Sequence, residues 1–151
     1  ERMPVLSYGG LVGSLSQVFE NTAWVQLLCS KTHPVSCIDK RSRVVGVVEW
    51  RHRNFFEVKH VGAVEDVMAG DTLLTSGFGG TIPKGYVVAI VTHVAPASDG
   101  LSLRIHARSP VNFQGLEEVF VMTEEIPWER SLFYDNADTS LMRDLLMRRR
   151  R

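Results

Sequence analysis

The sequence predicts an all-β protein of two small barrels, and we favour an arrangement in which one barrel is inserted into the other. Three observations predict this class. Apolar and polar residues alternate with the two-residue period of a half-buried strand, the expected strands are short, and glycine-containing turns separate them at close intervals. This pattern is typical of a barrel or sandwich rather than of a parallel sheet covered by helices.

The expected strands are spread over most of the chain. In order, they cover residues 11–18, 23–28, 44–50, 55–61, 72–75, 86–94, 101–106 and 118–122. The polar turn 51–54 joins two of them into a hairpin. The turn dipeptide Asp99-Gly100 joins another two in the same way, because this dipeptide favours tight connections between antiparallel strands.

Two segments that each begin with a glycine suggest how the chain is divided. Residues 10–18 resemble residues 85–94, since both are largely apolar and both end in a polar pair followed by valine. We interpret them as strands of one discontinuous barrel, formed by residues 9–33 and 68–122. Residues 34–67 would then form the second, inserted barrel.

The remaining residues, 123–151, are expected to form a C-terminal tail. Its first half is rich in acidic residues and contains Pro127. Its second half contains the one helix that we expect, at residues 139–150, because leucines and methionine recur there on one helical face. Thr139 would cap the start of this helix, and the closing arginines suit the negative end of its dipole.

Composition excludes several classes of function. Lys plus Arg and Asp plus Glu both number 17 in the 151 residues, so the formal net charge is zero and a nucleic-acid interface is not expected. No run of 18 or more apolar residues indicates a membrane span. The five histidines do not follow metal-ligand spacing, and we expect neither a metal nor a cofactor.

The two cysteines, Cys29 and Cys37, have the wrong number and spacing for a zinc site or a disulfide scaffold. We interpret them as buried thiols. A single disulfide in an oxidising compartment is the alternative.

The most distinctive segment is residues 70–85, which contains five glycines and Pro83. Glycine and proline at this density predict tight turns with positive backbone angles, so we interpret the segment as structural. It is not a phosphate-binding loop, because the spacing of its glycines and lysine is wrong and no helix follows. The residues assigned to this structural turn motif are Gly70, Asp71, Thr75, Ser76, Gly77, Gly79, Gly80, Pro83 and Gly85.

Two alternative functions compete with a purely structural role. Ser76 precedes a glycine, and small β-barrels can carry the triad of a trypsin-like serine peptidase, although no histidine here has a supporting signature. A glycan-binding module is the other alternative, with Trp24, Trp50 and Trp128 as stacking platforms for the cell wall.

The hairpin of residues 44–61 offers a candidate surface for a partner. Strand alternation places Val44, Val48, Trp50, Phe56 and Val58 in the core. It leaves Val45, Val47 and Phe55 outside, beside charged residues, as in a docking surface. The alternative is that the first barrel covers this patch, or that a tightly curled barrel buries both faces.

The glycine-rich segment also resembles that of a known family. The resemblance rests on four ordered stretches, Gly70-Asp71-Thr72, Thr75-Ser76-Gly77, Ile82-Pro83-Lys84-Gly85 and Val88-Ala89-Ile90-Val91, which are similar to the hallmark segment of the MreC family of rod shape-determining proteins. The stretches at residues 10–13 and 24–28, and Gly46, also fit. The resemblance covers roughly residues 9–122. Ala89 departs from it, because the family usually has glycine there.

Resemblance to MreC implies a non-enzymatic scaffold of the bacterial cell-elongation machinery. Members have a cytoplasmic N-terminus, one transmembrane helix, a coiled coil and two small β-barrels outside the inner membrane. This chain would then be the periplasmic barrel portion, anchored by a helix that it does not itself contain. The implied partners are penicillin-binding transpeptidases, the MreD and MreB complex, and further copies of the chain. Self-association by these residues alone is expected to be weak.

Overall fold

Short strands separated by turns dominate the computed structural model, which describes residues 3–80 and 82–123. The strands are β1 (Pro4–Ser7), β2 (Gly10–Val18), β3 (Ala23–Leu27), β4 (Val35–Asp39), β5 (Val45–His52), β6 (Phe55–Lys59), β7 (Thr72–Thr75), β8 (Val87–Pro96), β9 (Leu103–Arg108) and β10 (Phe120–Val121). No helix occurs in the described residues, which confirms the all-β class. The helix expected at residues 139–150 lies outside them, as does the expected tail apart from Thr123.

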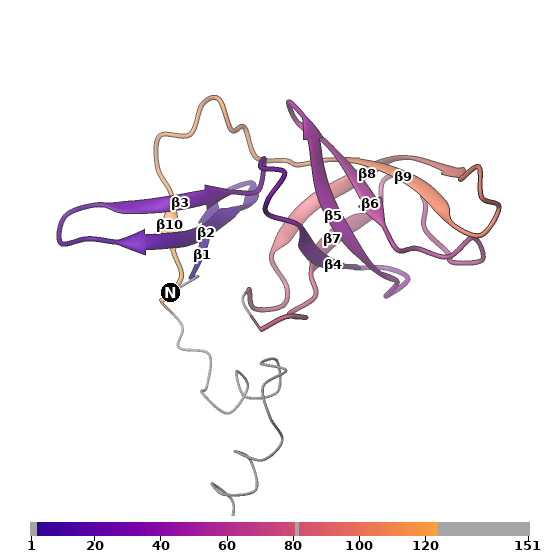
Figure 1. Cartoon of the computed structure of the whole chain (residues 1–151), viewed down its shortest axis with the longest axis horizontal. Coiled ribbons are helices and arrows are strands. Elements are labelled where there is room, and N and C mark those ends of the chain that lie inside the picture. Colours follow the sequence, from indigo (N-terminus) through magenta and orange to yellow (C-terminus); the bar gives the residue numbers. More distant parts are fainter. Residues whose placement is uncertain (1–2, 81, 124–151) are drawn as a thin grey trace, which may run out of the picture.

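Six of the strands close into an antiparallel barrel in the order β4-β5-β6-β9-β8-β7 (Figure 1). Strand alternation fills its interior, because every second side chain points inward. Val48, Phe56, Val58 and Ile105 are almost completely buried there. The core positions expected for the β5–β6 hairpin are therefore confirmed for Val48, Phe56 and Val58, while Val44 and Trp50 are partly buried against the same core.

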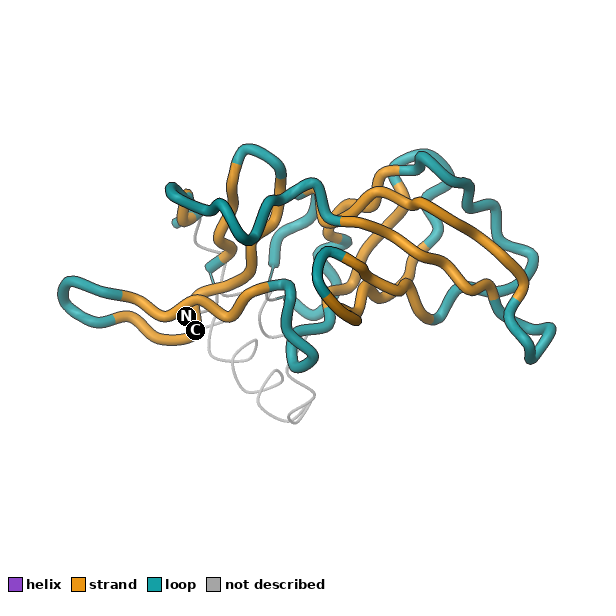
Figure 2. The backbone as a smooth tube through the Cα atoms, turned by 90° about the horizontal axis from the view of Figure 1, so that it is seen from above, coloured by secondary structure: helices purple, strands orange, loops and turns teal. Residues whose placement is uncertain are grey.

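The other four strands form an open sheet in the order β10-β1-β2-β3 (Figure 1). Its small core contains Val5, Val12, Leu15 and Val111, the last of which belongs to the segment that follows β9. Gly13 lets β2 and β3 approach closely, because a Cβ atom at this position would lie only 2.1 Å from the carbonyl oxygen of Gln26. The β2–β3 hairpin extends beyond the rest of the sheet as an arm (Figure 1 and Figure 2).

Sheet and barrel are joined by apolar packing as well as by the chain. Leu11 of β2 and Leu28, just after β3, belong to the same buried cluster as the barrel residue Val88. At the joint, Gly10 has a φ of 140°. A Cβ atom on Gly10 would lie 2.4 Å from the carbonyl oxygen of Val87. The joint therefore needs a residue without a side chain.

The expected division of the chain into barrels is wrong. Residues 34–67 do not form a separate inserted barrel, because β4, β5 and β6 share one closed barrel with β7, β8 and β9. The two similar segments also belong to different sheets, since β2 lies in the open sheet and β8 in the barrel. Alternation predicts a strand and its inner face, but it does not predict which strands pair.

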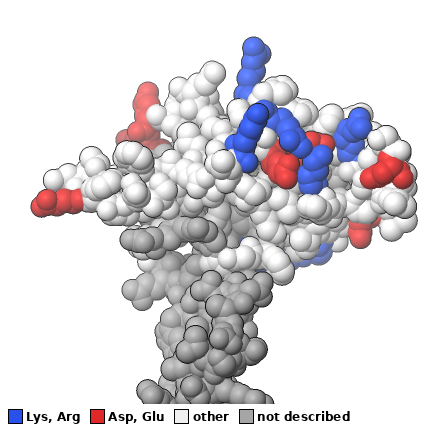
Figure 3. Space-filling view, in the orientation of Figure 1, with Lys and Arg blue, Asp and Glu red and all other residues white. Residues whose placement is uncertain are grey.

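Charged side chains are distributed unevenly between the two parts. Residues 3–28 and 111–123, which build most of the sheet, contain Glu20, Glu117 and Glu118 but no Lys or Arg. Figure 3 shows Lys and Arg side chains gathered over the barrel, with acidic side chains among them. The net charge of the whole chain is zero, but the barrel is more basic than the sheet.

Candidate functional site

Hydrogen bonds of two side chains at the end of β7 attach the glycine-rich segment to the barrel. The Thr75 hydroxyl donates a hydrogen bond to the Pro83 carbonyl oxygen at 2.6 Å and accepts one from the Tyr86 amide at 3.0 Å. The Ser76 hydroxyl is 2.8 Å from that of Ser36 in β4. These two side chains therefore tie the turn to itself and to the neighbouring strand.

The glycines of this segment adopt the backbone conformation that the sequence predicts. Gly77, Gly79, Gly80 and Gly85 have φ values of 78°, 89°, 67° and 110°. Residues with a Cβ atom rarely adopt such angles, so glycine lowers the strain of the turn.

At the start of the segment, Asp71 takes part in an ion-pair network. The Arg41 guanidinium donates to both oxygens of Asp71, at 2.9 and 2.8 Å, and to Asp66 at 2.6 Å. The Met68 amide also donates to Asp71. The hydrogen bonds from Arg41 outweigh the effect of burial and lower the pKa of Asp71 to about 2. The network holds the 66–71 loop against the β4–β5 turn.

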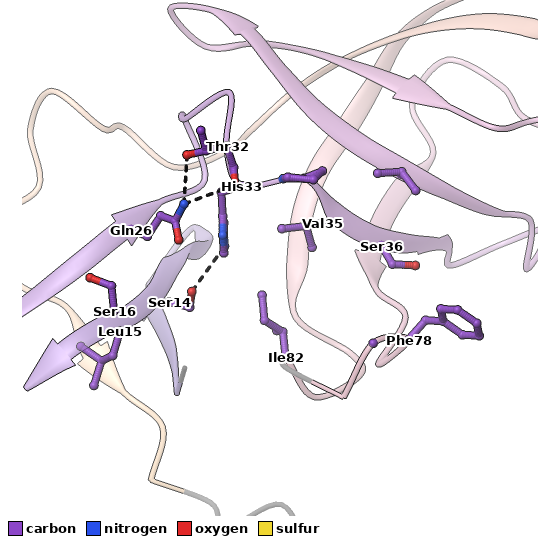
Figure 4. Close-up of a pocket in the computed structure, with 13 residues that line it drawn as sticks. Ser14, Leu15, Ser16, Gln26, Thr32, His33, Val35, Ser36, Phe78 and Ile82 are labelled. Carbon is purple, nitrogen blue, oxygen red and sulfur yellow. Dashed lines mark hydrogen bonds between the residues drawn. The ribbon is translucent and has the colours of Figure 1, made fainter. Parts of the chain in front are cut away.

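A pocket of about 640 Å³ lies between the sheet and the barrel, beside the glycine-rich segment (Figure 4). The strands β2, β3, β4 and β5, the 32–34 connection and the glycine-rich segment all contribute to its wall. Its lining residues are Ser14, Leu15, Ser16, Gln26, Thr32, His33, Pro34, Val35, Ser36, Val47, Phe78, Gly79 and Ile82. None of them carries a carboxylate, an ammonium or a guanidinium group.

Polar groups on the sheet side of this pocket are connected to one another. The Gln26 amide donates to the Thr32 hydroxyl at 3.1 Å and to the Thr32 carbonyl oxygen at 3.3 Å. The Ser14 hydroxyl lies 3.5 Å from Nε2 of His33 (Figure 4). The pocket suits an uncharged polar or apolar group rather than an ion.

The geometry does not assemble the hydrolase site considered above. The hydroxyl of Ser76 donates a hydrogen bond to the hydroxyl of Ser36 and accepts one from the Phe78 amide at 3.0 Å. Both hydrogen bonds hold the turn in place. The serine that approaches a histidine is Ser14, at the upper limit of hydrogen-bond length. Among residues 3–80 and 82–123, no group of three or more potential ligands is placed to hold a metal ion.

The three candidate contact residues do not form one patch. Val45 is 52% exposed, and Val47 lines the pocket. Phe55 lies at the opposite end of the hairpin, half-buried, with its ring stacked on His52 at 5.1 Å. In the β5–β6 pairing, Val47 lies opposite Lys59 and Phe55 lies opposite His52, so Val47 and Phe55 are at different ends of the hairpin.

The tryptophans proposed as stacking platforms are not gathered at the pocket. Trp24 lies on the β2–β3 arm, 65% exposed, and its ring meets Phe19 edge-on. Trp50 donates from its indole to the Arg53 carbonyl oxygen at 2.8 Å. Trp128 lies outside the described residues.

Both cysteines are free thiols, but the predicted burial is confirmed only for Cys37, because Cys29 is partly exposed. Cys37 is buried in the barrel core, and burial raises its pKa to about 12. Burial also raises the pKa of Cys29.

Sequence reasoning missed the sheet side of the pocket. Ser14, Gln26 and His33 come from β2, β3 and the following connection, and no motif joins them. Arg41, the partner of Asp71, was missed for a similar reason. Their neighbours are fixed by strand pairing rather than by local spacing.

Comparison with known proteins gives a consistent result. The sequence model of the family described as "Rod shape-determining protein MreC, barrel core" matches residues 1–123. The cell shape-determining protein MreC of Escherichia coli (strain K12) is 32% identical over 124 residues, which are 81% of this chain and 34% of that protein. The chain thus spans about a third of the length of this curated relative.

Solved structures have the same fold. The crystal structure of MreC from Pseudomonas aeruginosa superimposes with a TM-score of 0.75 at 28% identity, covering 80% of this chain and 78% of that one. A chain from the complex between penicillin-binding protein PBP2 and MreC of Helicobacter pylori gives a TM-score of 0.56 at 19% identity, covering 72% and 66%. At that identity, the second comparison shows the fold alone.

Two further findings concern the class of protein. Among the described residues there is no helix with the length and apolar character needed to cross a membrane. The family match extends over both the open sheet and the closed barrel, including every strand from β1 to β10. The chain therefore belongs to the MreC family of cell shape-determining proteins and contains that family's barrel core.

Proposed function

We propose that this chain is a non-enzymatic scaffold of the bacterial cell-elongation machinery, which binds cell-wall synthesis proteins on the periplasmic side of the inner membrane. The observation that carries the proposal is the match of the MreC barrel core over residues 1–123. Its proposed partners are penicillin-binding transpeptidases, the MreD and MreB complex, and other copies of the chain. The H. pylori relative, whose structure is a complex with PBP2, supports the first of these.

The hydrogen bonding of Ser76 supports the non-enzymatic part of the proposal. A nucleophilic serine requires a neighbouring base that accepts its proton. Ser76 instead contacts another hydroxyl, that of Ser36. A fluorophosphonate probe tests this directly, because it labels only an activated serine. Labelling of the folded chain that is lost in Ser76→Ala would favour the peptidase alternative.

For the partner surface, we propose two separate contacts rather than one. The first consists of Val45 and Val47, next to the pocket, and the second is centred on Phe55. An apolar side chain held at the rim of a preformed pocket supplies contact area at low conformational cost. The pocket would accept an apolar or uncharged polar side chain of the partner, since its lining carries no carboxylate, ammonium or guanidinium group.

The scaffold function is tested by co-purification from the bacterium that produces this protein. Tagged full-length protein is expected to retain a penicillin-binding transpeptidase, which labelled penicillin detects. Val47→Glu is expected to reduce the retained amount at least about ten-fold, because it places a charge beside the uncharged pocket. Val64→Glu is the matched control, since Val64 is 96% exposed and belongs to neither contact. Absence of any transpeptidase, or equal loss in both variants, would contradict the proposal.

A further inference from the structure

Outside the pocket, the outer surface of the barrel carries two rows of side chains that run across neighbouring strands. In the first row, Phe55 of β6 lies opposite His52 of β5 on one side and Arg108 of β9 on the other, and Arg108 in turn lies opposite Ile90 of β8. Directly paired residues share one face of a sheet. The row therefore places two apolar side chains among basic ones.

The second row lies beside the first. Glu57 of β6 is opposite His106 of β9, and His106 is opposite His93 of β8. The ring of His106 meets Phe55 edge-on at 4.8 Å and lies 5.8 Å from the ring of His93. We call the surface formed by His52, Phe55, Ile90, His93, His106 and Arg108 the β6–β9 face.

Positive charge on and beside this face is only partly compensated. Arg51 and Lys59 bind Glu57 at 2.6 and 2.7 Å. Burial raises the pKa of Glu57, but these two cations outweigh that effect and hold the pKa below its usual value. By contrast, Arg104 and Arg108 are exposed, and neither has a salt bridge with any residue of the described part of the chain.

The chemistry of the face indicates the kind of partner that fits it. Guanidinium groups and imidazole N–H groups are donors that recognise carboxylates, and an arginine can bind a carboxylate with two parallel hydrogen bonds. Phe55 is held between two rings, and Ile90 is 39% exposed. The two side chains lie on either side of Arg108, so each is an apolar position beside basic groups, which matches a segment that has an apolar residue between acidic ones.

We propose that the β6–β9 face is a docking surface for an acidic polypeptide segment that carries an apolar anchor. The inference rests on the proposed scaffold function only in taking the ligand to be a protein. A planar anionic membrane fits less well, because it would bring its phosphates against Glu49 and Glu57, which lie opposite each other beside the face. A polypeptide avoids this, since its acidic residues contact only Arg104, Arg108 and the imidazoles.

The test uses a fluorescein-labelled peptide with glutamates on both sides of a leucine, and fluorescence anisotropy as the readout. A matched peptide in which glutamine replaces every glutamate is the ligand control. The intact chain is expected to bind the acidic peptide at least about ten-fold more tightly than the glutamine peptide. Binding is expected to weaken as salt is raised from 50 to 300 mM, as screened charges require.

Variants then locate the binding surface. Arg104→Glu combined with Arg108→Glu is expected to weaken peptide binding at least about ten-fold. Lys40→Glu combined with Arg43→Glu changes the net charge equally at the β4–β5 turn and is expected to leave binding within about two-fold. If the first variant unfolds, as circular dichroism would show, Arg104→Gln with Arg108→Gln replaces it. Equal loss in both variants would mean that net charge alone attracts the peptide and would overturn the proposal.

Three further outcomes are decisive. Binding of the chain to phosphatidylglycerol vesicles, with no binding of the acidic peptide, would overturn the proposal in favour of a membrane surface. If the peptide binds at this face but no transpeptidase co-purifies, the inference holds and the proposed function fails. If a transpeptidase co-purifies and the peptide does not bind, the proposed function holds and the inference fails.

Discussion

Single residues in the glycine-rich segment show what local sequence can and cannot predict. Positive φ angles at Gly77 and Gly85 follow from glycine density alone, because few other residues tolerate them. The hydroxyl contact between Ser76 and Ser36 joins positions 40 residues apart, so no local pattern contains it. The turn was therefore predictable, while its attachment to β4 was not.

Gly85 gives a direct test of backbone strain. A Cβ atom there would meet nothing within 4 Å, so a change to alanine introduces strain without a clash. Gly85→Ala is expected to lower the free energy of unfolding by about 1 kcal/mol, because φ is 110°. Gly62→Ala, at a position without positive φ, is the control and is expected to stay within about 0.5 kcal/mol. Urea denaturation measures both, and equal stability of the two variants would contradict the strain argument.

Asp71 makes stability depend on pH. Its pKa is about 2 in the folded chain against an ordinary value of 3.8, so the folded state favours the carboxylate. The resulting stabilisation is complete above pH 4 and is lost as the pH falls towards 2. We expect a loss of about 1–2 kcal/mol from this group, less than the full shift implies because Arg41 is partly exposed to solvent.

The control for this effect is Asp71→Asn, which has no titrating carboxyl at this position. Denaturation curves between pH 5 and pH 2 are expected to be flatter for this variant than for the parent. Parallel curves would show that the ion pair with Arg41 does not stabilise the fold.

Among the elements, the β5–β6 hairpin was predicted most fully, whereas neither β1 nor β4 was predicted. Alternation gave the inner face of the hairpin correctly, with Phe56 and Val58 inside. In β4 the pattern is obscured, because Asp39 is completely buried while Ile38 is partly exposed. Asp39 tolerates burial since it accepts hydrogen bonds from the Arg41 amide and the Ser42 hydroxyl. These partners lie in the following turn, and the strand was not predicted.

Adjacent phenylalanines in β6 provide a matched comparison. Phe56 is fully buried, so Phe56→Ala is expected to cost about 3–5 kcal/mol through lost burial and a new cavity. Phe55 lies on the outer face against His52 and His106, so Phe55→Ala is expected to cost only about 1 kcal/mol. Thermal melting distinguishes the two. A large loss in Phe55→Ala would place this ring in the core and remove it from any partner surface.

On the scale of the whole molecule, the all-β class followed from the sequence but the pairing of the strands did not. The β6–β9 pairing joins Phe56 to Ala107, with two other strands between them in the chain. Periodicity specifies which side chains point inward, and it contains no information about such distant partners. The similarity of residues 10–18 to residues 85–94 was misleading, because any apolar strand that begins with a glycine gives the same pattern.

The joint between sheet and barrel is expected to be sensitive to the smallest side chain. Gly10→Ala would force a methyl group into the Val87 carbonyl oxygen and is expected to cost at least about 2 kcal/mol. Gly100→Ala, where a Cβ atom has no neighbour within 4 Å, isolates the cost of positive φ alone. Calorimetry is expected to show the greater loss for Gly10→Ala. Equal losses would mean that the joint relaxes freely.

The pairing of β1 with β10 has a mechanical consequence. Val5 lies opposite Val121 and Leu6 opposite Phe120, so the chain enters and leaves the sheet side by side. A tension applied between these two ends would separate their backbone hydrogen bonds one after another, as in opening a zipper. The closed barrel lies outside this path of force. Under load the sheet would therefore open first, while the barrel and any protein docked on it stayed intact.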